Sequence, residues 1–101
     1  MNVLEIKDRH GKSIKLTAEQ WKHILLHKVM SGQLENIRSA LEFPETIRQS
    51  NTDDGVKFYY KTIKDSPVRT KYLFVSVKYL NGEGFVITAF YTNKMKGDKI
   101  R

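Results

Sequence analysis

Apolar residues recur at helical spacing in two adjacent segments of the first half of the chain. The run TAEQ at residues 17–20 matches a capping box, in which the threonine side chain accepts a hydrogen bond from a first-turn amide. A helix is therefore expected over residues 17–29. Four residues form its buried stripe: Trp21, Ile24, Leu25 and Val29.

A second helix is expected over residues 33–42, after Ser31-Gly32 interrupts the periodic pattern. Its inward-facing residues are Leu34, Ile37 and Leu41. Pro44 ends this helix, because proline disfavours helical geometry in the residue before it.

Stretches rich in β-forming residues flank the two helices. Residues 3–17 indicate a β-hairpin with His10-Gly11 at its turn, where glycine can take a positive φ. Four further strands are expected after the second helix, separated by turn-forming segments. They cover residues 45–49, 56–63, 70–80 and 85–92.

This order of elements indicates an α+β fold. The N-terminal hairpin and the two helices are expected to pack on one face of an antiparallel, roughly four-stranded sheet. The length of 101 residues fits a single domain, residues 1–97, followed by a basic tail at 98–101. Hydrophobic residues make up 40% of the chain and charged residues 29%, which is typical of a globular protein rather than a disordered one.

The composition also bears on where the protein works. No apolar run approaches the ~20 residues that a membrane span requires, and the first ten residues lack the apolar region of a secretory signal. The chain has no cysteine, which rules out disulfides and thiolate metal sites. Together these features favour a cytoplasmic protein with no membrane partner.

The net charge of +7 is unevenly distributed along the chain. Residues 1–50 carry eight Lys/Arg against six Asp/Glu, whereas residues 51–101 carry ten against five. Such an excess favours polyanionic partners: RNA, DNA or an acidic protein. A solubilising surface charge without a partner explains the excess equally well.

Two of the three histidines, His23 and His27, lie four residues apart beside Trp21. On a helix they would share one side, at the flank of the buried stripe. Zinc normally needs a third ligand, and a catalytic zinc helix carries a glutamate between the two histidines, where this chain has Ile-Leu-Leu. We therefore expect no metal and no cofactor, and two solvated histidines are the simplest interpretation. His10, in a turn, is expected to be exposed.

Strand alternation assigns the side chains of the last two strands to faces. In the first of them, one face carries Leu73, Val75 and Val77, and the other carries Tyr72, Phe74, Ser76 and Lys78. In the second, one face carries Val86, Thr88 and Phe90, and the other carries Ile87, Ala89 and Tyr91. Lys78 and Thr88 lie on adjacent strands, and the register decides whether they share a face.

These residue types suffice for metal-independent RNA cleavage through the 2′-hydroxyl. A histidine serves as base or acid, and a lysine with hydroxyl donors stabilises the phosphorane. The five tyrosines offer rings on which unpaired bases stack: Tyr59, Tyr60, Tyr72, Tyr79 and Tyr91. Ordinary strand tyrosines and a solvated lysine account for the same residues without any function.

The order of several short motifs resembles a known family. These motifs are LTAEQWKHILLH at 16–27, FPETI at 43–47, KYLFVSVKY at 71–79 and GFVITAFYTNKMKG at 84–97. Together, spanning about residues 16 to 97, they are similar to phage-associated nuclease-like proteins of the barnase–EndoU–colicin–RelE (BECR) fold group. The resemblance implies N-terminal helices followed by a four-stranded antiparallel sheet, and a metal-independent ribonuclease that often acts as a toxin.

The resemblance also implies roles for particular residues. His23 or His27 would supply the acid/base histidine, with His23 preferred because it lies in the Trp-x-His-Ile core, and Lys78 and Thr88 would contribute from the sheet. Four cations would hold phosphates: Arg69, Lys71, Lys94 and Lys96. Tyr91 would also contact the nucleic acid. RNA is the partner that this assignment implies, and an acidic antitoxin or immunity protein is a further one.

The chain departs from the family pattern in two places. It has Phe90 where the closing strand often carries a tyrosine, and His27-Lys28-Val29 where the family tends to have His-Pro-Glu. These departures keep two alternatives open. One is a nucleic-acid-binding module without catalysis, and the other is a protein-interaction domain.

Overall fold

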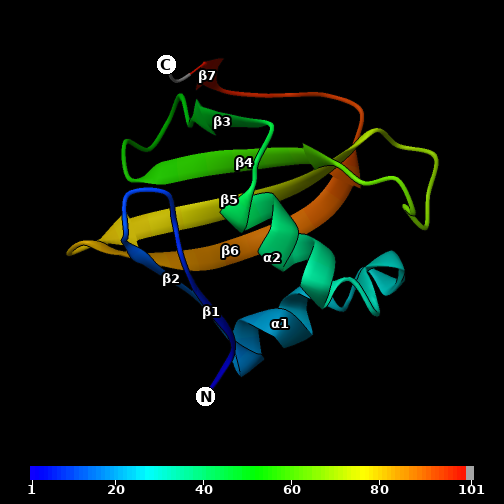
Figure 1. Ribbon diagram of the computed structural model, residues 1–101, viewed down its shortest axis with the longest axis horizontal. Helices are drawn as coiled ribbons and strands as arrows, with labels where there is room; N and C mark the ends of the chain where they lie inside the picture. Colours follow the sequence, from blue (N-terminus) through cyan, green and yellow to red (C-terminus); the bar gives the residue numbers. More distant parts are fainter. Residues whose placement is uncertain (100–101) are drawn as a thin grey trace.

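The structure, a computed structural model, describes residues 1–99, and its strands form one sheet (Figure 1). The elements in chain order are β1 (Asn2–Lys7), β2 (Ser13–Thr17), α1 (Ala18–Ile24), the 3-10 helix η1 (Lys28–Met30), α2 (Leu34–Glu42), β3 (Thr46–Gln49), β4 (Val56–Thr62), β5 (Tyr72–Leu80), β6 (Glu83–Thr92) and β7 (Asp98–Lys99). The strand order across the sheet is β1-β2-β6-β5-β4-β3-β7.

The α+β class is confirmed, but the sheet is wider than the roughly four strands expected. Strands β3 to β6 form an antiparallel centre, as predicted. The N-terminal hairpin extends that centre instead of packing on it, because β2 pairs in parallel with β6. This pairing satisfies backbone groups of the β6 edge that would otherwise be left without partners.

The segment expected to be a tail also joins the sheet in part. Asp98 and Lys99 form β7, which pairs antiparallel with Gln49 and Arg48 of β3. Gly97 makes this return possible with a φ of 86°, and a Cβ atom there would lie 2.5 Å from the carbonyl oxygen of Gln49. Residues 100–101 of the expected tail lie outside the described residues.

Helices cover one face of the sheet and bury a continuous row of side chains. Ile47, Tyr59, Val75 and Ala89 are direct neighbours across four strands. All four are buried and belong to one core cluster with residues from the helices. The contributing helical residues are Ile24 of α1, Met30 of η1, and Ile37, Ala40 and Leu41 of α2. Figure 1 shows α2 crossing this face of the sheet.

The first helix is shorter than predicted. It ends at Ile24, and the backbone of His27 is extended before η1 begins. Because this extended residue interrupts the helical repeat, the predicted stripe does not continue past it. Met30 is buried, and Val29, which was predicted to be buried, is exposed. The Thr17 cap is confirmed, since its hydroxyl accepts a hydrogen bond from the amide of Gln20 at 3.1 Å.

The second helix and the N-terminal hairpin are confirmed. Ile37 and Leu41 are buried and Leu34 packs against the core, and Gly11 takes a φ of 81° in the hairpin turn. Val3 forms a bulge opposite β2, because Asn2 pairs with Thr17 while Leu4 pairs with Leu16. The bulge explains why Val3, Leu4 and Ile6 are apolar without regular alternation.

A second bulge determines which residues of β6 face the helices. Ser76 pairs with Thr88 and Val77 pairs with Val86, so Ile87 is an extra residue in β6. Val86 and Ala89 consequently both lie in the core, on the face opposite to Thr88 and Phe90. The predicted grouping of Val86 with Thr88 and Phe90 is therefore wrong, because simple alternation allows no bulge.

Within residues 1–99, no helix has both the length and the apolar character that crossing a membrane requires.

Candidate nucleic-acid interface

The face of the sheet opposite the helices, here called the outer face, carries a cluster of aromatic rings. Phe74 of β5 lies at its centre, with ring centroids 5.1 Å from Phe58, 5.3 Å from Tyr60 and 4.6 Å from Phe90. Tyr72 extends the cluster with an edge-on contact to Tyr60. These rings bury one another without a layer of helices above them.

The rings form the floor of a shallow groove of about 260 Å³, here called the outer-face groove. Its lining adds hydroxyl and ammonium groups to the aromatic floor: Phe58, Tyr60, Phe74, Ser76, Thr88, Phe90, Thr92, Lys94 and Lys96. Phe58 and Phe90 are only half-buried, so a ligand can reach parts of both rings. The groove therefore offers stacking surfaces, hydrogen-bond donors and positive charge side by side.

The segment between β6 and β7 forms one wall of this groove. The amide of Lys96 donates a hydrogen bond of 2.9 Å to the Tyr60 hydroxyl, and the Arg48 guanidinium donates one of 3.2 Å to the Gly97 carbonyl. Burial raises the pKa of Tyr60, which keeps its phenol protonated. These contacts hold Lys96 at the border of the groove.

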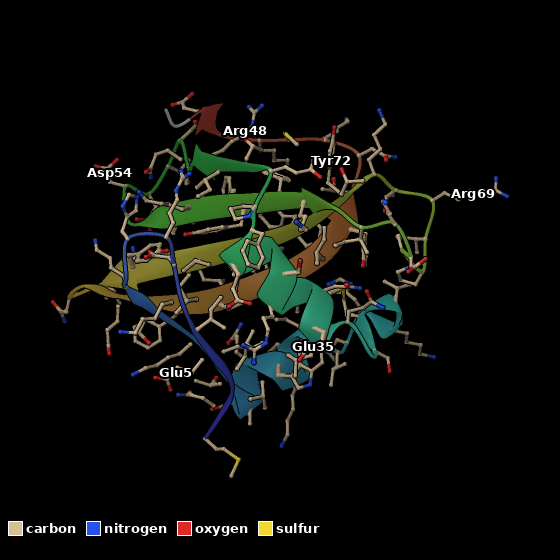
Figure 2. All side chains as sticks on the ribbon, in the orientation of Figure 1. Glu5, Glu35, Arg48, Asp54, Arg69 and Tyr72 are labelled. Atoms are coloured by element: carbon tan, nitrogen blue, oxygen red, sulfur yellow. The ribbon has the colours of Figure 1, made fainter. Side chains whose placement is uncertain are left out.

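Four predicted phosphate-binding residues come together at one end of the sheet. The amide of Lys71 donates to the side chain of Asn93 at 2.9 Å, which joins the start of β5 to the end of β6. Arg69, Lys71, Lys94 and Lys96 are all exposed, and none forms an ion pair with another described residue. Figure 2 shows Arg69 projecting from the loop between β4 and β5. We call this group the basic end.

The opposite end of the outer face is neutralised by ion pairs. Lys15 lies 3.1 Å from Glu83, and Lys78 contacts both oxygens of Asp53 at 2.6 and 2.8 Å. The free positive charge of the outer face is consequently concentrated at the basic end.

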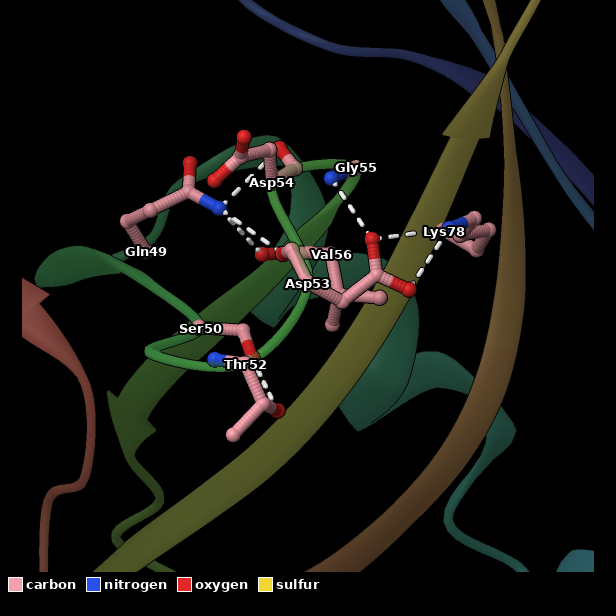
Figure 3. A network of polar contacts seen from close by, with 8 residues as sticks. All are labelled: Gln49, Ser50, Thr52, Asp53, Asp54, Gly55, Val56 and Lys78. Carbon is pink, nitrogen blue, oxygen red and sulfur yellow. Dashed lines mark hydrogen bonds and ion pairs between the residues drawn. The ribbon is translucent and has the colours of Figure 1, made fainter.

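Lys78, predicted to stabilise phosphate charge, instead anchors the turn between β3 and β4 (Figure 3). Asp53 also accepts a hydrogen bond from the amide of Gly55, and Gln49 donates to the backbone carbonyls of this turn. Hydrogen bonding from the Lys78 ammonium lowers the pKa of Asp53, so the carboxylate stays charged. Lys78 does not line the outer-face groove with Thr88.

The two histidines lie in different surroundings. His23 lines a hollow with residues of the N-terminus and α1, including Met1, Glu19 and Leu26. His27, three residues beyond the end of α1, lines a separate hollow of about 300 Å³ with Val29, Val68, Thr70, Phe90 and Tyr91. They do not share a helical face, because α1 ends between them. Both are exposed.

Tyr91, predicted to contact nucleic acid, lies on the helix-covered face. Its hydroxyl donates to the Gln33 side chain at 2.5 Å, and burial raises its pKa. Tyr59 and Tyr79 also lie on that face, and Tyr60 is only 1% exposed. Of the five tyrosines considered for stacking, Tyr72 is thus the half-buried one on the outer face.

Sequence reasoning did not select Phe58 and Phe74 as candidate binding residues. Alternation within VKFYYKTI does contain the signal, since Phe58, Tyr60 and Thr62 share a face. Their pairing with Ser76, Phe74 and Tyr72 follows from the register between β4 and β5.

Among residues 1–99, no three histidine, aspartate or glutamate side chains approach one another as a metal site requires. Comparison with protein-family models, curated proteins and solved structures gives no match to this chain. We therefore infer function from the geometry of the chain itself.

Replacing Lys78 with methionine is expected to raise the pKa of Asp53 toward the ordinary value of 3.8, because the main cause of its depression is removed. The amide of Gly55 remains and leaves a smaller depression. Carbon-detected NMR titration of the carboxylate measures the change. Lys94→Met is the matched control and should leave this pKa unaltered. An unchanged pKa in Lys78→Met would show that the ion pair does not form in solution.

Proposed function

We propose that this chain binds single-stranded RNA across the outer face of its sheet. The observation that carries the proposal is the aromatic cluster on the face away from the helices, next to cations that form no ion pair within residues 1–99. Proteins that bind single strands combine aromatic rings, on which bases stack, with a basic groove that follows the backbone. Phe58 and Phe90 supply the accessible rings, and Lys94 and Lys96 border them.

The hydroxyl groups of the groove add to this fit. Ser76 and Thr88 are directly paired between β5 and β6, at the centre of the outer face. Hydroxyls can donate to and accept from base edges and the ribose 2′-hydroxyl, which distinguishes RNA from DNA. The mixed lining therefore favours RNA over an entirely apolar protein partner.

Metal-independent ribonuclease activity is the second candidate function, and one observation favours it. Phe90 lines both the outer-face groove and the hollow that contains His27. An RNA strand stacked on Phe90 would thus lie close to an imidazole.

The antiparallel centre β3–β6, preceded by two helices, also supports the BECR-like fold that the motifs resemble. Such a nuclease would be a toxin or a phage-associated protein, held in check by an acidic antitoxin or immunity protein.

In this second function, His27 replaces His23 as the preferred acid/base residue. The 2′-oxygen attacks phosphorus as His27 removes its proton, and the bond to the 5′-oxygen breaks to give a cyclic phosphate. Water protonates the departing 5′-oxygen to a free 5′-hydroxyl, and His27 returns its proton to the solvent. Lys94 and Lys96 would stabilise the phosphorane and Thr88 would donate a hydrogen bond. Lys78 takes no part, because Asp53 neutralises its charge.

RNA binding is tested by replacing Phe90 with leucine, which keeps an apolar side chain but removes the aromatic ring. Loss of one stacked base costs about 1–3 kcal/mol, so affinity for a single strand of about 12 nucleotides should fall roughly 5- to 150-fold. Fluorescence anisotropy measures it. Phe43→Leu is the matched control, because Phe43 is 69% exposed and lies outside the outer-face groove. Equal affinity in both variants would contradict stacking on Phe90.

The basic end is tested in the same assay at several salt concentrations. Removing two phosphate contacts with Lys94→Ala/Lys96→Ala should reduce the slope of log affinity against log salt by about 1.4. Lys22→Ala/Lys28→Ala removes the same charge from α1 and η1 and should keep the wild-type slope. A slope that changes equally in both variants would indicate attraction by net charge alone.

Catalysis is tested by incubating the protein with total RNA in EDTA. Cleavage that persists in EDTA, is retained by His23→Ala and is abolished by His27→Ala is the expected result for a histidine-dependent nuclease at this site. Cleavage that survives in His27→Ala rules out the assignment. If the wild-type protein does not cleave, the binding function stands alone.

A further inference from the structure

A second pocket lies on the other side of the sheet, at the end that the helices leave uncovered. It has a volume of about 260 Å³ and sits between the β1–β2 turn and the β3–β4 turn. Figure 1 shows these two turns approaching each other at the same end of the sheet. Tyr59, Tyr79 and Ile47 line its inner part. We call it the turn pocket.

The β1–β2 turn is held rigid by Asp8. One carboxylate oxygen accepts hydrogen bonds from the amides of His10 at 2.8 Å and Lys12 at 2.9 Å, and the other accepts from the Tyr79 hydroxyl at 2.9 Å. Burial opposes ionisation, but the amide of Lys12 and the Tyr79 hydroxyl outweigh it and lower the pKa of Asp8. Asp8 is therefore charged, and its oxygens are occupied within the fold.

The tyrosines at the base of the pocket form a directed chain. Tyr79 donates its only hydroxyl proton to Asp8, so the 2.5 Å contact between the two phenols has Tyr59 as donor. Burial raises the pKa of both phenols, which keeps these protons in place. The base is thus fixed and has no hydroxyl donor left for a ligand.

The border of the pocket carries the free charge. The ammonium groups of Lys12 and Lys57 lie 5.8 and 6.0 Å from the centre of the same Tyr79 ring. Arg9 and His10 also line the pocket, and none of the four forms an ion pair with another described residue. The opposing carboxylates are Asp8, which is already occupied, and Asp54, which is exposed.

We propose that the turn pocket binds a small phosphorylated molecule. Lys12, Lys57 and Arg9 contact its phosphate, and the rest of the molecule packs against Tyr79. Phosphate suits this border because cations from the β1–β2 turn and from the start of β4 line it, and neither carboxylate of the lining forms an ion pair with them. The pocket lies between two turns at one end of the sheet rather than along a face, which suits a compact ligand. The site is separate from the outer-face groove, and the two share no lining residue.

Inorganic pyrophosphate is the probe that tests this proposal. It is titrated into the ¹⁵N-labelled full chain at constant ionic strength. We expect saturable shifts at the amides of His10, Lys12 and Gly55. The Lys12→Ala/Lys57→Ala variant should bind about tenfold more weakly or worse, as loss of charged contacts predicts. Lys94→Ala/Lys96→Ala removes equal charge from the outer face and should bind within about twofold of wild type.

Shifts that do not saturate, or equal weakening in the two variants, would overturn the proposal. Lys12→Gln/Lys57→Gln provides a second pair of neutral side chains if the alanine variant loses its folded spectrum. A titration with single-stranded RNA tests whether the pocket binds the phosphates of a nucleic-acid backbone instead of a small molecule. If RNA shifts the pocket amides and pyrophosphate does not, the pocket belongs to RNA binding and the small-ligand proposal is wrong.

Discussion

The extra residue in β6 is the constraint on which the outer face depends. Because Ile87 has no partner in β5, Val86 and Ala89 both face the core, while Thr88 and Phe90 face outward. With regular pairing through β6, Phe90 and Val86 would share a face, and either the aromatic cluster would lose a ring or the core would lose an apolar side chain. The side chain of Gln20 donates to the carbonyl of Ile87, so α1 contacts the chain at this point.

That arrangement leaves two partly exposed aromatic rings on the face away from the helices, next to cations that form no ion pair within residues 1–99. Phe74 is only 7% exposed because its neighbours surround it, yet Phe58 and Phe90 remain half-buried. At one end of the face Lys78 is neutralised by Asp53, and at the other Lys94 and Lys96 have no acidic partner among the described residues. A ligand with both flat rings and negative charge fits this distribution, and single-stranded RNA has both.

Local patterns in the sequence predicted the fold class, the hairpin, the second helix and the central strands, because each has its own apolar period and its own turn residues. The early end of α1 was not predictable from the sequence. Val29 has the spacing of a buried residue if the helix continues, whereas Met30 is buried because the helix ends at Ile24. The phosphate-binding roles of Arg69, Lys71, Lys94 and Lys96 came from a family resemblance and stay a prediction. The surroundings of Lys78 and Tyr91 could not be predicted, because their partners Asp53 and Gln33 are distant in sequence. The separation of the two histidines follows from the early end of α1.

Binding of RNA across the outer face can be tested by intermolecular NOE measurement on a complex with single-stranded RNA. We predict contacts from the ring protons of Phe58, Phe90 and Tyr72 to base and ribose protons, and none from Ile37 or Leu41 beneath the helices. Contacts that arise only from the helix-covered side, or a complex in which these rings show no contact with RNA, would contradict it.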